Sequence, residues 1–106
     1  MDKQQANMNA ARVAGYTPRL ISGAVFTGNP YDKAQNAKAF DIFATTEWHE
    51  AILAVLCAHH SAMLWIDEEN KNWCIQLENS EIYTGVRLAD ALASVCAEAV
   101  EGMEES

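Results

Sequence analysis

The most regular pattern of apolar and polar positions lies near the C-terminus. Between Val86 and Glu101, apolar residues recur at intervals of three and four, which places them on one face of an α-helix. The pattern predicts an amphipathic helix that ends at Gly102, a typical C-terminal stop, with residues 103–106 as a loose acidic tail. The apolar face comprises Leu88, Ala91, Leu92, Val95, Cys96, Ala99 and Val100.

Two upstream segments have the alternation of β-strands. From Ala62 to Asp67, apolar residues occupy both alternating faces, which predicts a strand covered on both sides. From Trp73 to Leu77, large apolar residues alternate with others, which predicts a half-buried strand. The polar residues 68–71 between the two predict an antiparallel hairpin, and residues 81–84 would add a third strand.

A second helix is predicted from Glu47 to His60. Thr46 is the expected N-cap, and Glu47 and Glu50 lie where carboxylates favour the positive end of the helix dipole. Trp48, Ile52 and the apolar residues that follow recur at helical spacing. This segment is therefore expected to lie against the sheet.

The first 45 residues are less regular. Residues 1–15 favour a weak helix or a frayed arm, because they contain helix formers but few large apolar side chains. Residues 20–26 are consistent with one strand, in which Gly23 marks a bulge or a close approach. Residues 31–44 fit either a helix or a short strand. Together these elements predict one α+β domain over residues 1–106, with a small antiparallel sheet (a hairpin or a three-stranded meander) packed with two to three helices.

Charge divides the chain unevenly. The 106 residues have a net charge of −8. Residues 1–46 contain three acids and five bases, a balance of +2, whereas residues 47–106 contain twelve acids and two bases, a balance of −10. The acidic part should repel nucleic acid and anionic membranes and attract a basic partner. No run approaches the ~18 apolar residues of a membrane span, and the first residues lack the apolar core of a signal peptide.

Sequence motifs for catalysis are incomplete. His49-Glu50 begins like a zinc-protease HExxH motif, but Leu53 stands where the second histidine is needed, which excludes that class. Cys57, His59 and His60 lie close in sequence, yet a helix would spread them over different faces, and their spacing is not that of a zinc site. The three cysteines are odd in number and lie in apolar runs, which predicts reduced, mostly buried thiols in a cytoplasmic protein. We therefore predict no catalytic, metal-binding or cofactor-binding residue and a non-enzymatic protein.

The residues most suited to contact a partner are acids and two tryptophans. Carboxylates cluster at the predicted hairpin turn, and further acids follow the second strand and line the outer face of the last helix. Tryptophan is enriched in binding hot spots, so a partly exposed Trp48 or Trp73 would also be a contact candidate. The predicted partner-binding residues are Asp67, Glu68, Glu69, Glu78, Glu81, Asp90, Glu98, Glu101, Trp48 and Trp73.

The tryptophan-bearing strand, polar turn and Ala/Leu-rich helix over residues 73–100 resemble the C-terminal part of the phage ABA-sandwich proteins, and the similarity extends over about residues 46–101. The resemblance implies a phage or prophage origin and the cytoplasm of a bacterial host. Small acidic phage proteins include anti-CRISPR inhibitors, which implies a partner that is a basic host protein or ribonucleoprotein complex, without direct nucleic-acid or membrane binding. The alternative is a phage accessory or structural protein that acts through homo-oligomerisation, for instance as a homodimer.

Overall fold

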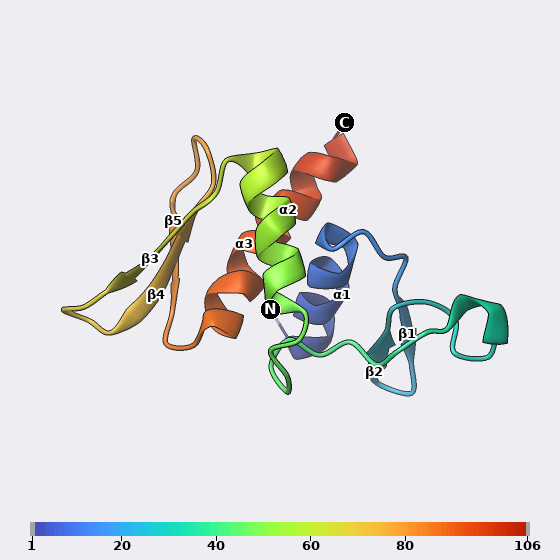
Figure 1. Cartoon of the computed structure of the whole chain (residues 1–106). Helices are drawn as coiled ribbons and strands as arrows, with labels where there is room; N and C mark the ends of the chain where they lie inside the picture. Colours follow the sequence, from blue (N-terminus) through green and yellow to red (C-terminus); the bar gives the residue numbers. More distant parts are fainter. Residues whose placement is uncertain (1, 106) are drawn as a thin grey trace.

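The computed structural model describes residues 2–105, with side chains up to Met103. In the described part, three helices lie between two small antiparallel sheets, so the predicted α+β class is confirmed (Figure 1). The elements are α1 (Lys3–Val13), β1 (Arg19–Ile21), β2 (Ala24–Phe26), the 3-10 turn η1 (Lys33–Gln35), α2 (His49–His60), β3 (Met63–Asp67), β4 (Asn72–Gln76), β5 (Ile82–Gly85) and α3 (Leu88–Glu105).

α3 forms the centre of the molecule. Its predicted apolar face is confirmed: Leu92, Val95 and Cys96 are fully buried, and α3 packs against α1, β4 and β5. The predicted stop at Gly102 is wrong, since the helix continues to Glu105. Gly102 does not adopt the positive φ that a glycine cap requires. Residues 103–105 are therefore helical and not a loose tail, and Ser106 lies outside the described residues.

α1 is an integral helix, and the expectation of a frayed arm is wrong. The side chain of Asp2 accepts a hydrogen bond from the backbone N–H of Gln5 and caps its start. Ala6, Ala10 and Ala11 are almost fully buried, and their small size lets α1 lie close to α3. Large apolar residues are not needed, because the alanines supply the contact.

The segment expected to be one strand is a hairpin. β1 pairs with β2, and the turn residues Ser22 and Gly23 both have positive φ, as in the tight type I′ turn. The side chain of Gln4 donates a hydrogen bond to the carbonyl of Gly23 at 3.0 Å and ties the turn to α1. In the segment 31–44, η1 forms a single turn and Ala39 makes an isolated bridge to Phe26.

α2 begins at His49, two residues later than predicted. Thr46 does not cap it; instead Thr45 accepts a hydrogen bond from the backbone of Glu47 and holds the preceding turn. The side chain of Trp48 is buried against Phe40, with ring centroids 4.8 Å apart. α2 thereby joins the core.

The sheet β3–β4–β5 is the predicted three-stranded meander, with β4 at its centre. The sequence pattern predicts that β3 is covered on both faces, and this is wrong. β3 is an edge strand, and α3 packs mainly against β4 and β5. As a result Met63, Leu64 and Ile66 are 59%, 39% and 54% exposed.

Gly85 ends β5 where the chain turns into α3. A Cβ atom placed there would lie 2.6 Å from the backbone nitrogen of Ala91 and 2.6 Å from the Cβ of Asp90. Only glycine allows this close approach. The turn fixes the position of the whole sheet relative to α3.

Candidate interaction surface

The three-stranded sheet projects from the helices, and we call residues 63–85 the blade (Figure 1). The register places Leu64, Ile75 and Tyr83 side by side on the inner face, towards α3. Ile75 is fully buried there, whereas Leu64 lies beyond the cover of α3. The inner face thus belongs to the core at β4 and is exposed at the edge strand β3.

Among the described residues, no helix covers the outer face of the blade. The register places Met63 beside Gln76 and Ile82, and Trp65 beside Cys74. Met63 and Ile82 are 59% and 51% exposed, while Cys74 is buried between its neighbours. The outer face therefore presents apolar side chains to solvent.

Three of the eight predicted acids stabilise the fold. Asp67 accepts hydrogen bonds from the backbones of Glu69 and Asn70 and from the Asn70 side chain. The hydrogen bond from the Asn70 side chain lowers the pKa of Asp67. Asp90 accepts from the backbone of Arg87 and lies 3.6 Å from its guanidinium, and Glu98 accepts from the Tyr83 hydroxyl. Asp67 thus stabilises the β3–β4 turn, Asp90 the start of α3, and Glu98 the contact between the blade and α3.

The other five acids are free of ion pairs among the described residues. Glu68 and Glu69 lie at the β3–β4 tip, and Glu78 and Glu81 lie near the opposite end of β4. Glu101 joins the second group, because its charge acts on Tyr83 together with that of Glu81. The two groups are separated by the length of β4, about 17 Å for five residues. The predicted acids therefore do not form one continuous face.

Tyr83 joins the second acidic group to α3. Its hydrogen bond to Glu98, its burial and the charges of Glu98, Glu81 and Glu101 raise the pKa of Tyr83 to about 12. Because this value lies above the ~10 of a model tyrosine, the neutral phenol stabilises the fold fully below about pH 10. That contribution is lost as the pH rises through 12. Sequence patterns do not single out Tyr83, since Glu98 is fifteen residues away.

We expect Glu98→Gln to lower the pKa of Tyr83 more than Glu101→Gln does. The new amide at position 98 keeps a hydrogen-bond acceptor but lacks the charge that favours the protonated phenol, whereas Glu101 is the weakest of the contributing charges. An ultraviolet absorbance titration between about pH 9 and about pH 13 measures this, with Tyr83→Phe identifying the late-titrating group. Equal shifts in the two variants would show that Glu98 has no special role.

The two tryptophans differ in position. Trp48 is 8% exposed and its indole N–H has no hydrogen-bond partner among the described residues, so it does not meet the condition of partial exposure set for a contact candidate. Its ring completes an aromatic cluster with Phe40 and Tyr16. Trp73 is half-buried and lines a cavity of about 310 Å³ next to the start of α3.

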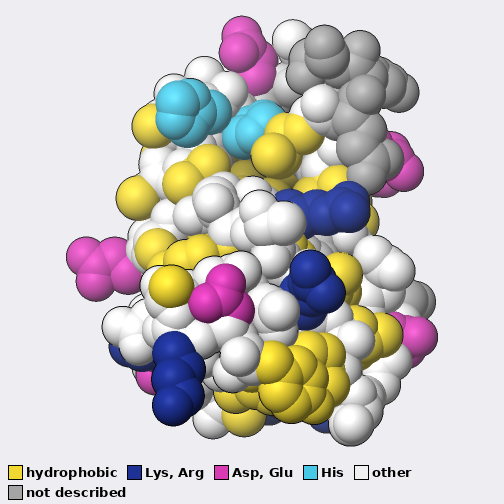
Figure 2. Space-filling view, turned by 90° about the vertical axis from the view of Figure 1, so that its right-hand side faces the viewer, with side chains coloured by type: hydrophobic (Ala, Val, Ile, Leu, Met, Phe, Trp, Pro, Cys, Tyr) yellow, Lys and Arg dark blue, Asp and Glu magenta, His cyan; other side chains and the backbone are white. Residues whose placement is uncertain are grey.

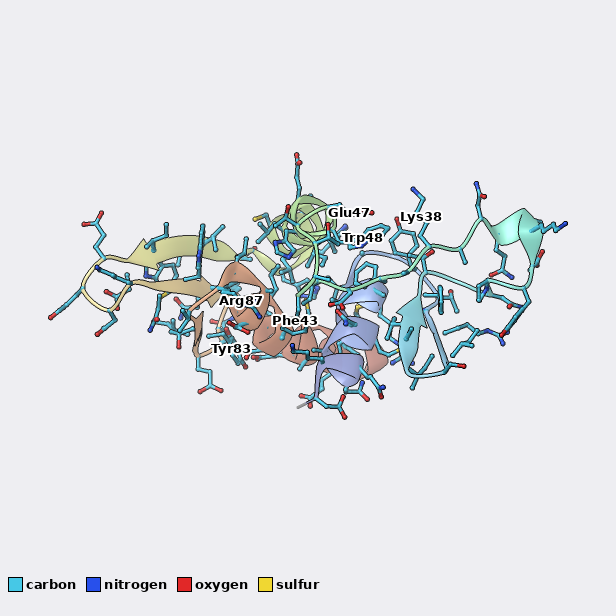
Figure 3. The ribbon with its side chains drawn as sticks, turned by 90° about the horizontal axis from the view of Figure 1, so that it is seen from below. Lys38, Phe43, Glu47, Trp48, Tyr83 and Arg87 are labelled. Carbon is cyan, nitrogen blue, oxygen red and sulfur yellow. The ribbon has the colours of Figure 1, made fainter. Side chains whose placement is uncertain are left out.

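This cavity lies between α3 and the loop before α2. His49 contributes a ring nitrogen 2.8 Å from the carbonyl oxygen of Ile42. Arg87 lies over the ring of Phe43, 6.0 Å from its centroid, and the two side chains are close together in Figure 3. Since Arg87 is also paired with Asp90, its charge is already compensated. Trp73 and Arg87 both line this cavity.

The end of the molecule opposite the blade, which contains the β1–β2 hairpin, is weakly basic. Arg19, Lys33 and Lys38 are exposed on the β1–β2 hairpin and the segment after it. Figure 2 shows Lys and Arg side chains distributed over this end, beside exposed hydrophobic ones. The long axis of the molecule, 46 Å, thus runs from a weakly basic end to the acidic blade.

The cysteines are not all buried. Cys74 and Cys96 are, and burial raises the pKa of Cys96 to about 12, which suppresses its reactivity. Cys57 is exposed on α2, so the thiols are mostly buried, as predicted, with Cys57 as the exception. In the described part of the chain, no three His, Cys, Asp or Glu side chains are grouped to hold a metal ion, and no helix there could cross a membrane.

The sequence pattern does not reveal the residues that the edge position exposes. It places Met63, Leu64 and Ile66 in a buried strand, because their pattern is that of a strand with two covered faces. The number of covering elements is the available signal: the two to three predicted helices are too few to cover both faces of every strand. Comparison with known proteins adds no assignment, since no family model, curated protein or solved structure matches the chain.

Proposed function

We propose that the chain is a small, non-enzymatic, phage-type interaction protein that blocks a basic nucleic-acid-binding surface of a host defence complex, in the manner of anti-CRISPR inhibitors. The observation that supports this most is the pair of glutamate groups without basic partners, among the described residues, at the two ends of the blade. Glu68 and Glu69 form one group, and Glu78, Glu81 and Glu101 form the other.

The apolar outer face between these groups has the composition of an interface centre. A protein interface commonly has an apolar centre and a polar rim, and the rim charges set specificity and association rate. Met63, Trp65 and Ile82 lie on this face. An exposed ion pair contributes only about 0.2–1 kcal/mol, so the apolar centre would supply much of the affinity.

Capture at low salt tests the proposal. The immobilised chain is incubated with lysates of candidate bacterial hosts, and we expect it to retain a nucleic-acid-binding protein that is released as salt rises and screens the charges. The retained protein is then purified and mixed with labelled nucleic acid. We expect the chain to displace that nucleic acid. Retention of no such partner, or simultaneous binding of chain and nucleic acid, would contradict the proposal.

The alternative is an accessory or structural protein that acts through homo-oligomerisation. The exposed edge of β3 favours it, because an unpaired strand can pair with another copy. In that case the acids only keep the assembly soluble. A tight oligomer that retains no basic partner in the capture experiment would favour this alternative.

A further inference from the structure

β3 has one edge without a hydrogen-bonded neighbour among the described residues. Proteins usually protect such edges with lysine, proline, a bulge or a covering segment. Apart from the charge of Asp67 at its end, β3 has none of these among the described residues: it consists of Met63-Leu-Trp-Ile-Asp67, and all five residues form a regular ladder with β4. An unpaired strand edge of this kind is a template for pairing with another strand.

We infer that this strand is β3 of a second copy, paired antiparallel about a two-fold axis at Trp65. This register is self-complementary. It places Leu64 opposite Ile66 of the second copy, and Ile66 opposite Leu64, all on the inner face beyond the cover of α3. Cross-strand pairs of this kind are the unit of sheet stabilisation. Leu64 and Ile66, which are partly exposed in the single chain, would thereby become buried in both copies.

The acidic tip beyond β3 suits the same register. Glu68 and Glu69 are exposed and follow one end of the strand. Antiparallel pairing places the acidic tips of the two copies at opposite ends of the new ladder and keeps them apart. Parallel pairing would bring like charges together, which is unfavourable.

The other strand edges are less suited to self-pairing. β1 has three residues and begins with an exposed Arg19, which protects its edge. β5 has four residues, follows Glu81 and packs against α3. β3 combines the length, the apolar character and the freedom from contacts that pairing requires.

The dimer would contain one six-stranded antiparallel sheet with the order β5-β4-β3-β3-β4-β5. Its inner face carries both α3 helices, and its outer face stays open. Only the following consequence rests on the proposed function: the two blades would present their glutamate groups to one basic surface together, and two linked sites bind more tightly than one.

Sedimentation of the full chain as a function of concentration tests the dimer. We expect the wild type to dimerise in the micromolar range, and Ile66→Lys to raise the dissociation constant at least about tenfold by placing a charge in the new sheet. The matched control is Ile82→Lys, since Ile82 is 51% exposed on the other edge strand and Ile66 is 54% exposed. Ile82→Lys should leave the dimer intact. A monomeric wild type, or equal loss in both variants, would overturn the inference.

Cross-linking tests the register independently of affinity. In a Cys57→Ser background, which removes the exposed thiol, a mixture of Leu64→Cys and Ile66→Cys chains should form disulfide-linked dimers on mild oxidation. Each variant alone should cross-link much less. If the chain stays monomeric and Ile66→Lys instead abolishes capture of the basic partner, a partner strand occupies the edge and the dimer is wrong. The sedimentation result does not depend on any host partner, so the two proposals can fail separately.

Discussion

Phe40→Ala should destabilise the protein by about 3–5 kcal/mol, the usual cost of removing a buried phenylalanine. Phe40 is 1% exposed and lies against Trp48 and Tyr16, and its backbone N–H donates to the carbonyl of Val25 at 2.8 Å. It therefore connects the β1–β2 hairpin with α2. The alanine would leave a cavity between elements that touch few other parts of the core.

Chemical denaturation measures this loss, read as a fall in the midpoint at constant slope. Tyr31→Ala is the matched control, since it removes an aromatic ring that is 80% exposed, and its effect should stay within about 0.5 kcal/mol. Similar losses in the two variants would mean that the aromatic cluster does not stabilise the N-terminal segment.

Charge reversal at the blade tip, Glu68→Lys with Glu69→Lys, should weaken binding to the captured partner about 30- to 100-fold, or about 2–3 kcal/mol. Both side chains are exposed, so their replacement should leave the fold intact. Two attractive contacts to a basic surface would each become repulsive. Most of the change should appear at low salt, because screening weakens exposed charges.

The matched control reverses two other exposed acids: Glu47, which precedes α2, and Glu50, in its first turn. It changes the net charge by the same amount at a place away from the blade. Binding isotherms at two salt concentrations compare the variants. Equal weakening in both pairs would show that only net charge matters and that the blade is not the contact surface.

Local periodicity predicts the elements whose apolar faces are continuous. The α3 face from Leu88 to Val100 and the strand from Trp73 to Leu77 follow directly from spacing, because each packs on a single side. The β1–β2 hairpin is missed, since its turn is Ser22-Gly23 and not one of the common Asn-Gly or Asp-Gly pairs. The sequence predicts only a weak helix or a frayed arm for α1, because alanines and not large apolar residues make its contact with α3.

The candidate surface is predictable only in part. The acids can be identified as a set, but tertiary contacts decide which of them are available: Asp90 serves the start of α3, and Glu98 serves Tyr83. Exposure of β3 depends on its place at the edge of the sheet, which no local pattern encodes. Burial of Trp48 likewise depends on Phe40, whose segment has no single structure predicted from its sequence.

Displacement of nucleic acid from the captured partner tests the central claim most directly. Labelled nucleic acid is bound to the purified partner and titrated with the wild type and with a variant in which Glu68, Glu69, Glu78, Glu81 and Glu101 are all replaced by glutamine. We predict that the wild type displaces the nucleic acid at low salt and that the variant does not, although both are folded. Equal displacement by the two chains, or none by either, would contradict the claim that the glutamates of the blade occupy a nucleic-acid-binding surface.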